Sequence, residues 1–253
     1  MLTTRVMPCL LLRNGALVKT IRFKDPGYVG DPTNAIKIYN EKEVDELVVL
    51  DITATVDGRR PSFAVIEMFV SECFMPVAYG GGLSRMEDVA EVFRLGIEKV
   101  VINSQAVKQP AFIRELSERF GAQAVMVSID AKRKSEGGYE VWTNGGRTAT
   151  GLDPRAFAEQ MSAQGAGEIF LNSIDRDGTM EGYDLELLRL VTSAVDVPVI
   201  ACGGAGKVAD FGRAVKEGGA AAVAAGSMVV YFGRNRAVLI NFPSKRELGK
   251  VLN

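Results

Sequence analysis

The amino-acid sequence predicts an α/β protein folded as one closed (β/α)8 barrel, a TIM barrel, that spans residues 1–253. Eight short apolar runs rich in β-branched residues alternate with longer amphipathic stretches, which is typical of βαβ units on a parallel sheet. The length of 253 residues suits eight such units in one barrel. No linker, low-complexity segment or shift in composition indicates a second domain.

The expected strands are short and follow one another along the whole chain. They cover residues 5–10, 46–52, 75–79, 99–103, 124–130, 168–173, 197–202 and 221–225. Helix start signals stand between them. Asp31 and Asp153 each place an N-cap before a first-turn proline, and Ser84 with Glu87 matches a capping box. Eight strand–helix units in this order favour a closed barrel over an open doubly wound sheet.

An internal repeat divides the predicted barrel into two halves. A shift of 122 residues places 75–82 on 197–204, and eight of the 34 positions from 74 to 107 become identical. The same shift aligns Glu46 with Glu168. We therefore expect two similar half-barrels of four units each.

Two connections are longer than the others. Residues 11–30 follow the first strand and residues 131–152 follow the fifth, and the turn signals Asn14-Gly15 and Gly137-Gly138 lie within them. Loops after barrel strands lie on the C-terminal face, where barrel active sites are built. We expect small hairpins here that act as lids or binding loops.

Composition excludes several classes of function. The 30 Lys and Arg residues balance 31 Asp and Glu residues, and a net charge of −1 argues against binding to a nucleic-acid backbone. Without any histidine there can be no Ser-His-Asp triad, no Cys-His glutaminase or protease, and no His-ligated zinc. Acid–base chemistry must then use Asp, Glu, Lys, Tyr or Cys.

The apolar residues and cysteines indicate where the protein works. No apolar run reaches the length of about 18 residues that spans a membrane. Cys9, Cys73 and Cys202 are far apart in sequence, which is typical of reduced, buried thiols in a cytoplasmic protein rather than of ligands or nucleophiles. We expect neither a metal nor a cofactor.

Glycine clusters and small polar residues end four of the expected strands. They are Gly80-Gly81-Gly82 and Asn103-Ser104 in the first half, and Gly203-Gly204 and Gly226-Ser227 in the second. Glycine backbone N–H groups and helix N-termini suit phosphate, which barrels often hold after strands seven and eight. The pattern predicts two related anion sites for a ligand phosphorylated at both ends. Tight turns without a ligand are the alternative.

Carboxylates at strand ends are the candidate acids and bases. Asp130 ends the fifth strand, Asp51 ends the second, and Asp175 and Asp177 follow the sixth. A charge directly after an apolar strand points into the barrel mouth, where it is costly unless used or paired. Asp130 is the favoured functional residue, whereas Asp51 and Asp175 suit helix capping or loop orientation equally well. Residues 177–179 also fit a plain turn.

Four charged residues stand at the opposite end of the barrel. Arg5, Glu46, Lys99 and Glu168 begin strands one, two, four and six. If they point inward, they form two neutralising pairs across the bottom. From geometry alone, the favoured interpretation is a structural plug.

Motifs spread over nearly the whole chain resemble one family. They are Met7-Pro-Cys-Leu, Asp51-Ile-Thr-Ala, Gly80-Gly-Gly82, Ile102-Asn-Ser, Ile129-Asp-Ala-Lys-Arg133, Thr150-Gly-Leu-Asp, Ile174-Asp-Arg-Asp-Gly-Thr179, Gly182-Tyr-Asp-Leu and Cys202-Gly-Gly-Ala-Gly206. They are similar to the cyclase subunit of imidazole glycerol phosphate synthase. The resemblance implies a (β/α)8 barrel that receives ammonia from a class I glutaminase subunit at its bottom face. The ammonia then attacks a bisphosphorylated ribulosyl substrate at the top.

The resemblance also implies residue roles. Asp130 would be catalytic, and Lys19 would lie in a lid near the substrate. Gly82, Asn103 and Ser104 would bind one phosphate. The second part of the substrate site would comprise Asp177, Gly178, Thr179, Gly204, Gly226 and Ser227. The resemblance assigns the ammonia gate to Arg5, Glu46, Lys99 and Glu168, in place of the structural plug.

Two departures from the family affect the expected function. Leu11 stands where the family has a second catalytic aspartate, and leucine cannot transfer a proton. Asn172 stands where the family often has threonine. Residues 8–13, 17–24 and 40–47 resemble instead a paralogous group associated with acetamidino-sugar synthesis for bacterial surface polysaccharides. In that group a barrel works with its own glutaminase and a third, sugar-amidating protein.

Three functions remain open from the sequence. The leading one is an ammonia-channelling barrel subunit of a glutamine-dependent amidotransferase system that serves sugar amidation, with little cyclase activity. The alternative is the cyclase of histidine biosynthesis, a lyase in which another carboxylate or water replaces the missing aspartate. The third is a non-catalytic scaffold that only activates its glutaminase.

Overall fold

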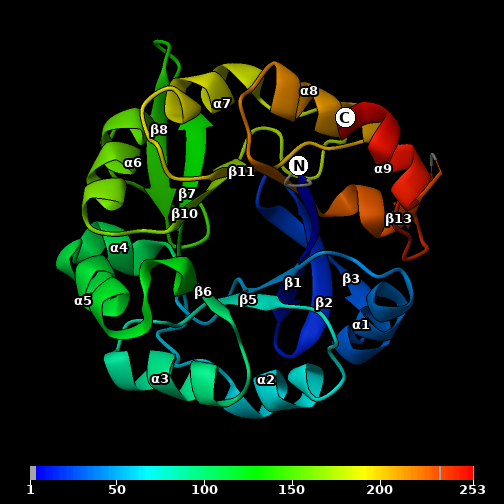
Figure 1. Ribbon diagram of the computed structural model, residues 1–253, viewed down its shortest axis with the longest axis horizontal. Helices are drawn as coiled ribbons and strands as arrows, with labels where there is room; N and C mark the ends of the chain where they lie inside the picture. Colours follow the sequence, from blue (N-terminus) through cyan, green and yellow to red (C-terminus); the bar gives the residue numbers. More distant parts are fainter. Residues whose placement is uncertain (1–3, 234, 253) are drawn as a thin grey trace.

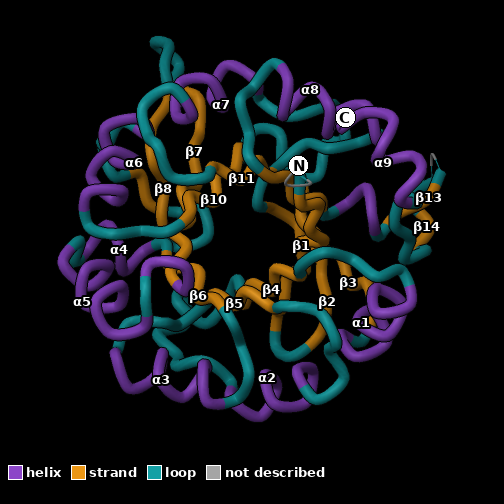
Figure 2. Tube along the Cα trace, viewed as in Figure 1, coloured by secondary structure: helices purple, strands orange, loops and turns teal. Residues whose placement is uncertain are grey.

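A closed barrel of eight parallel strands lies inside a ring of helices in the computed structural model, which describes residues 4–233 and 235–252 (Figures 1 and 2). In order around the barrel the strands are β1 (Arg5–Arg13), β4 (Leu47–Asp51), β5 (Val77–Gly80), β6 (Lys99–Ile102), β7 (Val125–Arg133), β10 (Glu168–Ser173), β11 (Val199–Cys202) and β12 (Ala222–Ala225). Pairing of β12 with β1 closes the sheet. The predicted (β/α)8 barrel is confirmed.

The strand ends differ from the expected ones by up to three residues for a structural reason. β1 and β7 run on to Arg13 and Arg133 because each pairs beyond the barrel with an antiparallel neighbour. These neighbours are β2 (Ala16–Ile21) and β8 (Tyr139–Thr143), and β3 (Lys24–Gly30) and β9 (Thr148–Ala149) follow them. The two expected hairpins are confirmed. Asn14 and Gly15 both have positive φ, 52° and 80°, as a two-residue hairpin turn requires.

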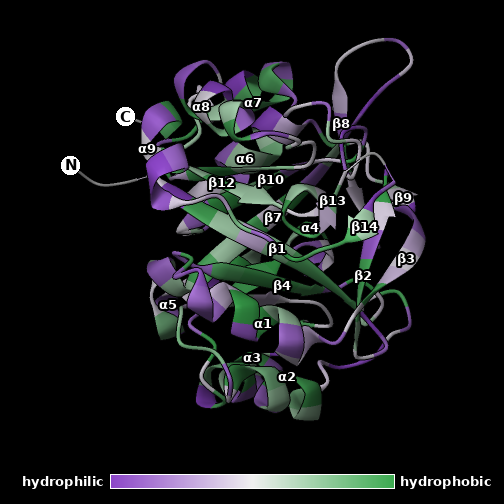
Figure 3. Ribbon diagram, turned by 90° about the vertical axis from the view of Figure 1, so that its right-hand side faces the viewer, coloured by the Kyte–Doolittle hydropathy of each residue, from purple (hydrophilic) through white to green (hydrophobic). Residues whose placement is uncertain are grey.

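The hairpins gather at one end of the barrel, with β2, β3, β8 and β9 together on the right of Figure 3. A third small hairpin, formed by β13 (Tyr231–Phe232) and β14 (Ala237–Val238), joins them. This is the end at which the parallel strands finish, so the loops that cover the barrel mouth are built largely from hairpins.

The helices cover the outside of the barrel. They are α1 (Pro32–Glu41), α2 (Phe63–Val70), α3 (Met86–Arg94), α4 (Ser104–Lys108), α5 (Ala111–Phe120), α6 (Pro154–Ala163), α7 (Leu185–Thr192), α8 (Val208–Lys216) and α9 (Lys245–Leu252), with short 3-10 turns at Ala122–Ala124 and Ser227–Val229. Asp31 and Asp153 cap α1 and α6 as predicted, each accepting hydrogen bonds from two backbone N–H groups. The capping box predicted at Ser84 is wrong, because α3 starts one residue later, after Arg85, with no side-chain cap.

The two halves share local geometry. Asn103, before α4, and Gly226, before the 3-10 turn at Ser227–Val229, have nearly equal dihedral angles, with φ/ψ of −117°/−89° and −103°/−84°. Helices α3 and α8 both follow an extended, basic N-cap residue, Arg85 and Lys207. The backbone thus supports the half-barrel repeat seen in the sequence.

A dry layer fills the middle of the barrel. Met7, Met126, Phe170 and Ile200 point inward and are completely buried, with Val48 beside them. This layer separates the bottom of the barrel from its mouth. Within the described ranges, no helix is long and apolar enough to cross a membrane.

The dry layer should carry a large part of the stability. Phe170→Ala removes a completely buried ring, so we expect the free energy of unfolding to fall by about 3–5 kcal/mol. Phe74 is 88% exposed, and Phe74→Ala is the matched control, with an expected change within about 0.5 kcal/mol. Urea unfolding followed by circular dichroism measures both. Equal losses in the two variants would contradict a packed layer at this level.

Candidate functional site

A cavity of about 810 Å³ opens at the carboxyl ends of the barrel strands. It brings together most of the site residues predicted from sequence, which are Lys19, Gly82, Asn103, Ser104, Asp130, Asp177, Gly178, Gly204, Gly226 and Ser227. Thr179 does not line this cavity. Its hydroxyl donates a hydrogen bond to the carbonyl of Arg176 at 2.9 Å, within its own turn.

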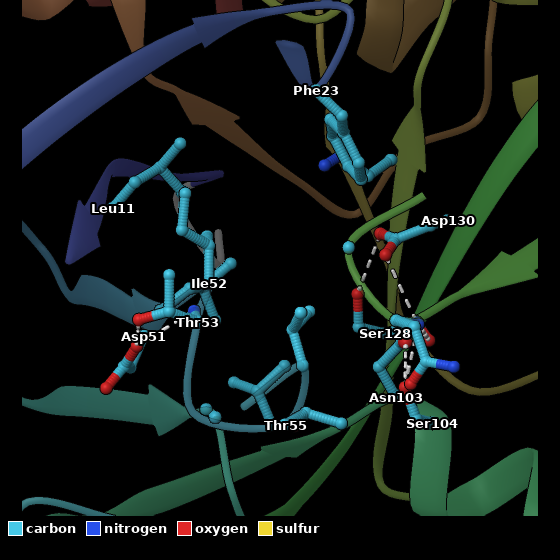
Figure 4. A pocket seen from close by; sticks show the side chains of 18 of the residues that line it. Leu11, Phe23, Asp51, Ile52, Thr53, Thr55, Asn103, Ser104, Ser128 and Asp130 are labelled. Atoms are coloured by element: carbon cyan, nitrogen blue, oxygen red, sulfur yellow. Dashed lines mark hydrogen bonds between the residues drawn. The ribbon is translucent and has the colours of Figure 1, made fainter. Parts of the chain in front are cut away.

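Asp130 lies on the polar wall of the cavity, at the inner end of β7 (Figure 4). Its carboxylate accepts hydrogen bonds from the hydroxyl of Ser128 and from Nδ2 of Asn103, both at 3.3 Å. Burial raises the pKa of Asp130 to about 7, partly offset by the Ser128 hydrogen bond and reinforced by the charge of Asp177. A carboxyl group with this pKa can both accept and return a proton near neutral pH.

The opposite wall is apolar. Leu11, at the inner side of β1, lies beside Leu50 and Ile52, across the cavity from Asp130 in Figure 4. Phe23, from the turn between β2 and β3, also lines the cavity. One wall of the cavity therefore carries a carboxyl group and the facing wall is apolar, because β1 has a leucine at the position that faces Asp130.

Two of the candidate carboxylates orient loops. Oδ1 of Asp51 accepts hydrogen bonds from the backbone N–H of Thr53 and Ala54, at 2.9 and 3.0 Å. Asp175 accepts one from the backbone N–H of Arg133 at 2.8 Å. These contacts match the capping and loop-orienting alternative for both residues. Of the three, Asp130 remains the carboxylate that suits a chemical role in the cavity.

Lys19 reaches from β2 into the barrel axis and is buried. Its ammonium group donates a hydrogen bond to the carbonyl of Cys9, and burial lowers the pKa of Lys19. A Cβ at Gly226 would come within 2.7 Å of Nζ of Lys19, so the glycine leaves the room that the lysine occupies. Near it, the buried side chains of Cys9 and Cys202 belong to the same apolar cluster. Because these two cysteines are far apart in the sequence, the sequence alone did not predict that they lie together.

Asp177 fastens the β2–β3 hairpin over the mouth. Its carboxylate accepts hydrogen bonds from the Thr20 hydroxyl at 2.6 Å and from the Phe23 backbone N–H at 3.1 Å. The next residue, Gly178, has φ of +69°, and a Cβ there would lie 2.1 Å from the carbonyl oxygen of Thr20. Only glycine lets the two loops approach this closely. Burial raises the pKa of Asp177 despite these hydrogen bonds.

The residues of the first predicted anion site are held by loop contacts. Gly82 has φ of +72°, and a Cβ there would lie 2.7 Å from the carbonyl oxygen of Arg59, so this glycine is needed for packing as well as for any ligand. Its backbone N–H donates to the Thr55 hydroxyl at 3.1 Å. Oγ of Ser104 accepts a hydrogen bond from the backbone N–H of Asn144 at 3.1 Å. The turn between β8 and β9 is thereby joined to the first half of the mouth.

The four charges at the bottom of the barrel form a closed ring. Nζ of Lys99 lies 3.0 Å from Glu46 and 3.1 Å from Glu168. Arg5 lies 2.5 Å from Glu46 and also pairs with Glu168. The Glu46 side chain is only 4% exposed, so removing either cation would leave a nearly buried carboxylate with half of its compensation.

Sequence reasoning missed several lining residues. Ser128 lies two positions before Asp130 on the same strand, and the period of two along β7 was the available signal. Asn172 pairs in register with Asp130 and is buried, with Oδ1 lacking a hydrogen-bond partner in the described part of the protein. The cationic lining was also missed, and it comprises Arg13, Arg59, Arg60, Arg85, Lys108 and Arg147. Among the described residues, no three Cys, Asp or Glu side chains are grouped to hold a metal.

The raised pKa of Asp130 predicts a pH-dependent stability. Between about pH 4 and 7 the unfolded chain releases this proton and the folded protein keeps it, so the contribution of Asp130 to stability falls as pH rises and levels off above its folded pKa. Asp130→Asn removes this dependence. We expect the variant to gain up to about 1.4 kcal/mol per pH unit relative to the unmodified protein over this range. Urea unfolding at pH 5, 6, 7 and 8 measures it, and a constant difference would show that Asp130 is ionised throughout.

Comparison with known proteins agrees with this geometry. The family described as "Histidine biosynthesis protein" matches residues 5–235. A Pseudomonas aeruginosa protein named "Putative imidazole glycerol phosphate synthase subunit hisF2" is 47% identical over 248 residues, covering 98% of this chain and 99% of that protein. The "Imidazole glycerol phosphate synthase subunit HisF" of Alkaliphilus metalliredigens is 45% identical over 231 residues, covering 91% and 92%. The chain therefore belongs to the histidine biosynthesis protein family, among the HisF-like cyclase subunits of imidazole glycerol phosphate synthase.

Proposed function

We propose that this protein is the ammonia-conducting barrel subunit of a glutamine-dependent amidotransferase system, and that it serves sugar amidation in surface-polysaccharide synthesis. One observation carries the proposal. The barrel keeps a charged ring at its bottom and an acid-bearing cavity at its mouth, but Leu11 occupies the cavity wall that faces Asp130. The charged ring that we propose as the ammonia entrance is present, and the second carboxylate is not.

The ammonia must come from another chain. This protein has no histidine to activate a cysteine for glutamine hydrolysis. A class I glutaminase docked at the bottom face would deliver ammonia at the ring formed by Arg5, Glu46, Lys99 and Glu168. Phe74, which precedes β5 at this end of the barrel, is 88% exposed and offers an apolar contact for such a partner.

The interior favours the neutral form of the nitrogen. Above the ring the axis is filled by Met7, Met126 and Phe170, all completely buried. An ammonium ion entering this layer without a partner would lose its hydration at high cost, whereas neutral ammonia would not. Passage requires these side chains to move aside, because the layer is closely packed.

At the mouth, the cavity suits a phosphorylated small molecule. The glycine loops at Gly82 and Gly204, with Ser104 and Ser227, would bind its anionic groups, and Asp130 would exchange a proton with the arriving nitrogen. A third protein would complete the amidation of an N-acetyl sugar. Membership of the paralogous group is supported by Leu11 and by the relatives whose names carry the suffixes hisF2 and hisF3.

The alternative function is the cyclase of histidine biosynthesis. The names of the relatives favour it, and so does the retention of Asp130, Lys19 and both glycine loops in one cavity. It requires another group to replace the carboxylate absent at position 11. Asp51 already accepts hydrogen bonds within its own loop and Asp177 accepts them from the β2–β3 hairpin, which makes both poor substitutes.

The ring predicts coupling between glutamine hydrolysis and use of the ammonia. Lys99→Leu leaves Glu46 and Glu168 with Arg5 as their remaining partner in the ring, so we expect a loss of about 3 kcal/mol in stability. In the complex with its cognate glutaminase, the ratio of amidated product to hydrolysed glutamine should fall. Lys37→Leu, on the outside of the barrel, is the control. Unchanged coupling in a folded Lys99→Leu protein would reduce the ring to a structural plug.

Leu11 predicts an absence of imidazole-forming activity. A general acid–base group typically contributes about 10² to 10⁴-fold to the rate, and leucine contributes none. With supplied ammonia and the bisphosphorylated ribulosyl substrate, we expect cyclisation to be detectable in Leu11→Asp and at least about 100-fold weaker in the unmodified protein. Leu11→Asn, similar in size but unable to accept a proton, is the control. Robust cyclisation by the unmodified protein would establish the cyclase alternative.

A further inference from the structure

Cationic side chains without partners surround the anion site in the first half of the barrel. Arg85, Lys108 and Arg147 line the cavity, and none of them forms an ion pair or a side-chain hydrogen bond with another residue in the described ranges. Arg59 and Arg60 differ, since they pair with carboxylates. Positive charges held together at the rim of a cavity without compensation raise the local potential and attract an anion.

Two of these cations closely follow predicted phosphate-binding residues in the sequence and line the same cavity. Arg85 follows Gly82 by three residues and precedes α3. Lys108 follows Ser104 by four residues on α4, so the two side chains lie on the same face of the helix, about 6 Å apart at Cβ. The first anion site therefore combines neutral groups at Gly82 and Ser104, here called the inner tier, with unpaired cations that line the same cavity, here called the outer tier.

The third cation belongs to the β8–β9 turn. Arg147 follows Asn144 by three residues, and the Asn144 backbone N–H donates to the Ser104 hydroxyl oxygen at 3.1 Å. This contact fixes the turn beside α4. The outer tier thus comes from three separate segments of the chain that line one cavity.

The second half lacks such a tier. Lys207 precedes α8 as Arg85 precedes α3, but it does not line the cavity. Four residues after Ser227 the chain has Tyr231, an uncharged residue. Because the two halves share their backbone geometry at these points, the difference lies in the side chains and marks a difference between the two ends of the ligand.

We propose that the first-half site binds a ligand that carries a diphosphate group. The inner phosphate would lie at Gly82 and Ser104, and the outer one among Arg85, Lys108 and Arg147. A cavity of about 810 Å³ is within the usual size of small-molecule sites and much larger than a single phosphate needs. This inference rests on the proposal that the barrel mouth binds a phosphorylated small molecule.

Calorimetric titration of the isolated protein tests the inference. The probes are inorganic phosphate, inorganic pyrophosphate and uridine diphosphate at constant ionic strength. We expect both diphosphates to bind at least tenfold more tightly than phosphate. In Arg85→Ala/Lys108→Ala this preference should be lost, while phosphate affinity changes less than threefold. Lys134→Ala/Lys207→Ala removes the same two charges from exposed positions outside the cavity and should keep the preference.

The outcomes separate the possibilities. Equal affinity for phosphate and pyrophosphate would overturn the proposal, and so would an equal loss in the control variant, since long-range charge would then explain the binding. Pyrophosphate binding without uridine diphosphate binding would identify free pyrophosphate as the source. Arg147→Ala serves if the double variant does not fold. Because no glutaminase is present, a failure here is distinct from a failure of ammonia coupling.

Discussion

The rest of this structure depends on the alternation of side chains along the eight strands of the closed barrel. Successive side chains point in turn to the inside and to the outside of the barrel. On β6 the inward positions are Lys99, Val101 and, just beyond the strand, Asn103. They belong in turn to the charged ring, the dry layer and the mouth. β10 repeats this order. Moving two residues along the strand leads from the charged ring to the dry layer, and two more lead to the mouth. Charged, apolar and hydrogen-bonding side chains therefore stay separate within a single strand.

The sequence predicted the features that depend on this periodicity. Apolar runs and their spacing predicted the eight strands, and turn signals such as Asn14-Gly15 predicted the hairpins. Charges at strand starts predicted the ring, since the first inward position of a strand must lie at the bottom. Asp130 followed from the same reasoning, as the last inward residue of an apolar strand.

The rest depends on contacts between loops, which have no period in the sequence. Asp177 and Thr20 are 157 positions apart, and nothing local to either residue indicates that they meet. Cys9 and Cys202 come together because β12 lies between β1 and β11 in a closed sheet. The cations of the mouth were not predicted, because arginines and lysines are common on the surface of any protein. Only the cavity shows which of them share a site.

Leu11 stands at a position where the fold places little constraint on the side chain. Its strand position is set by pairing in register with Leu50 and Val18, which uses the main chain alone. This pairing does not depend on the side chain at position 11, and an aliphatic side chain there packs against a wall that is already apolar. A substitution at this position can therefore alter the chemistry of the cavity while the strand pairing is kept. The fold and the chemistry of the cavity thus depend on different parts of the same residue, the fold on its main chain and the chemistry on its side chain.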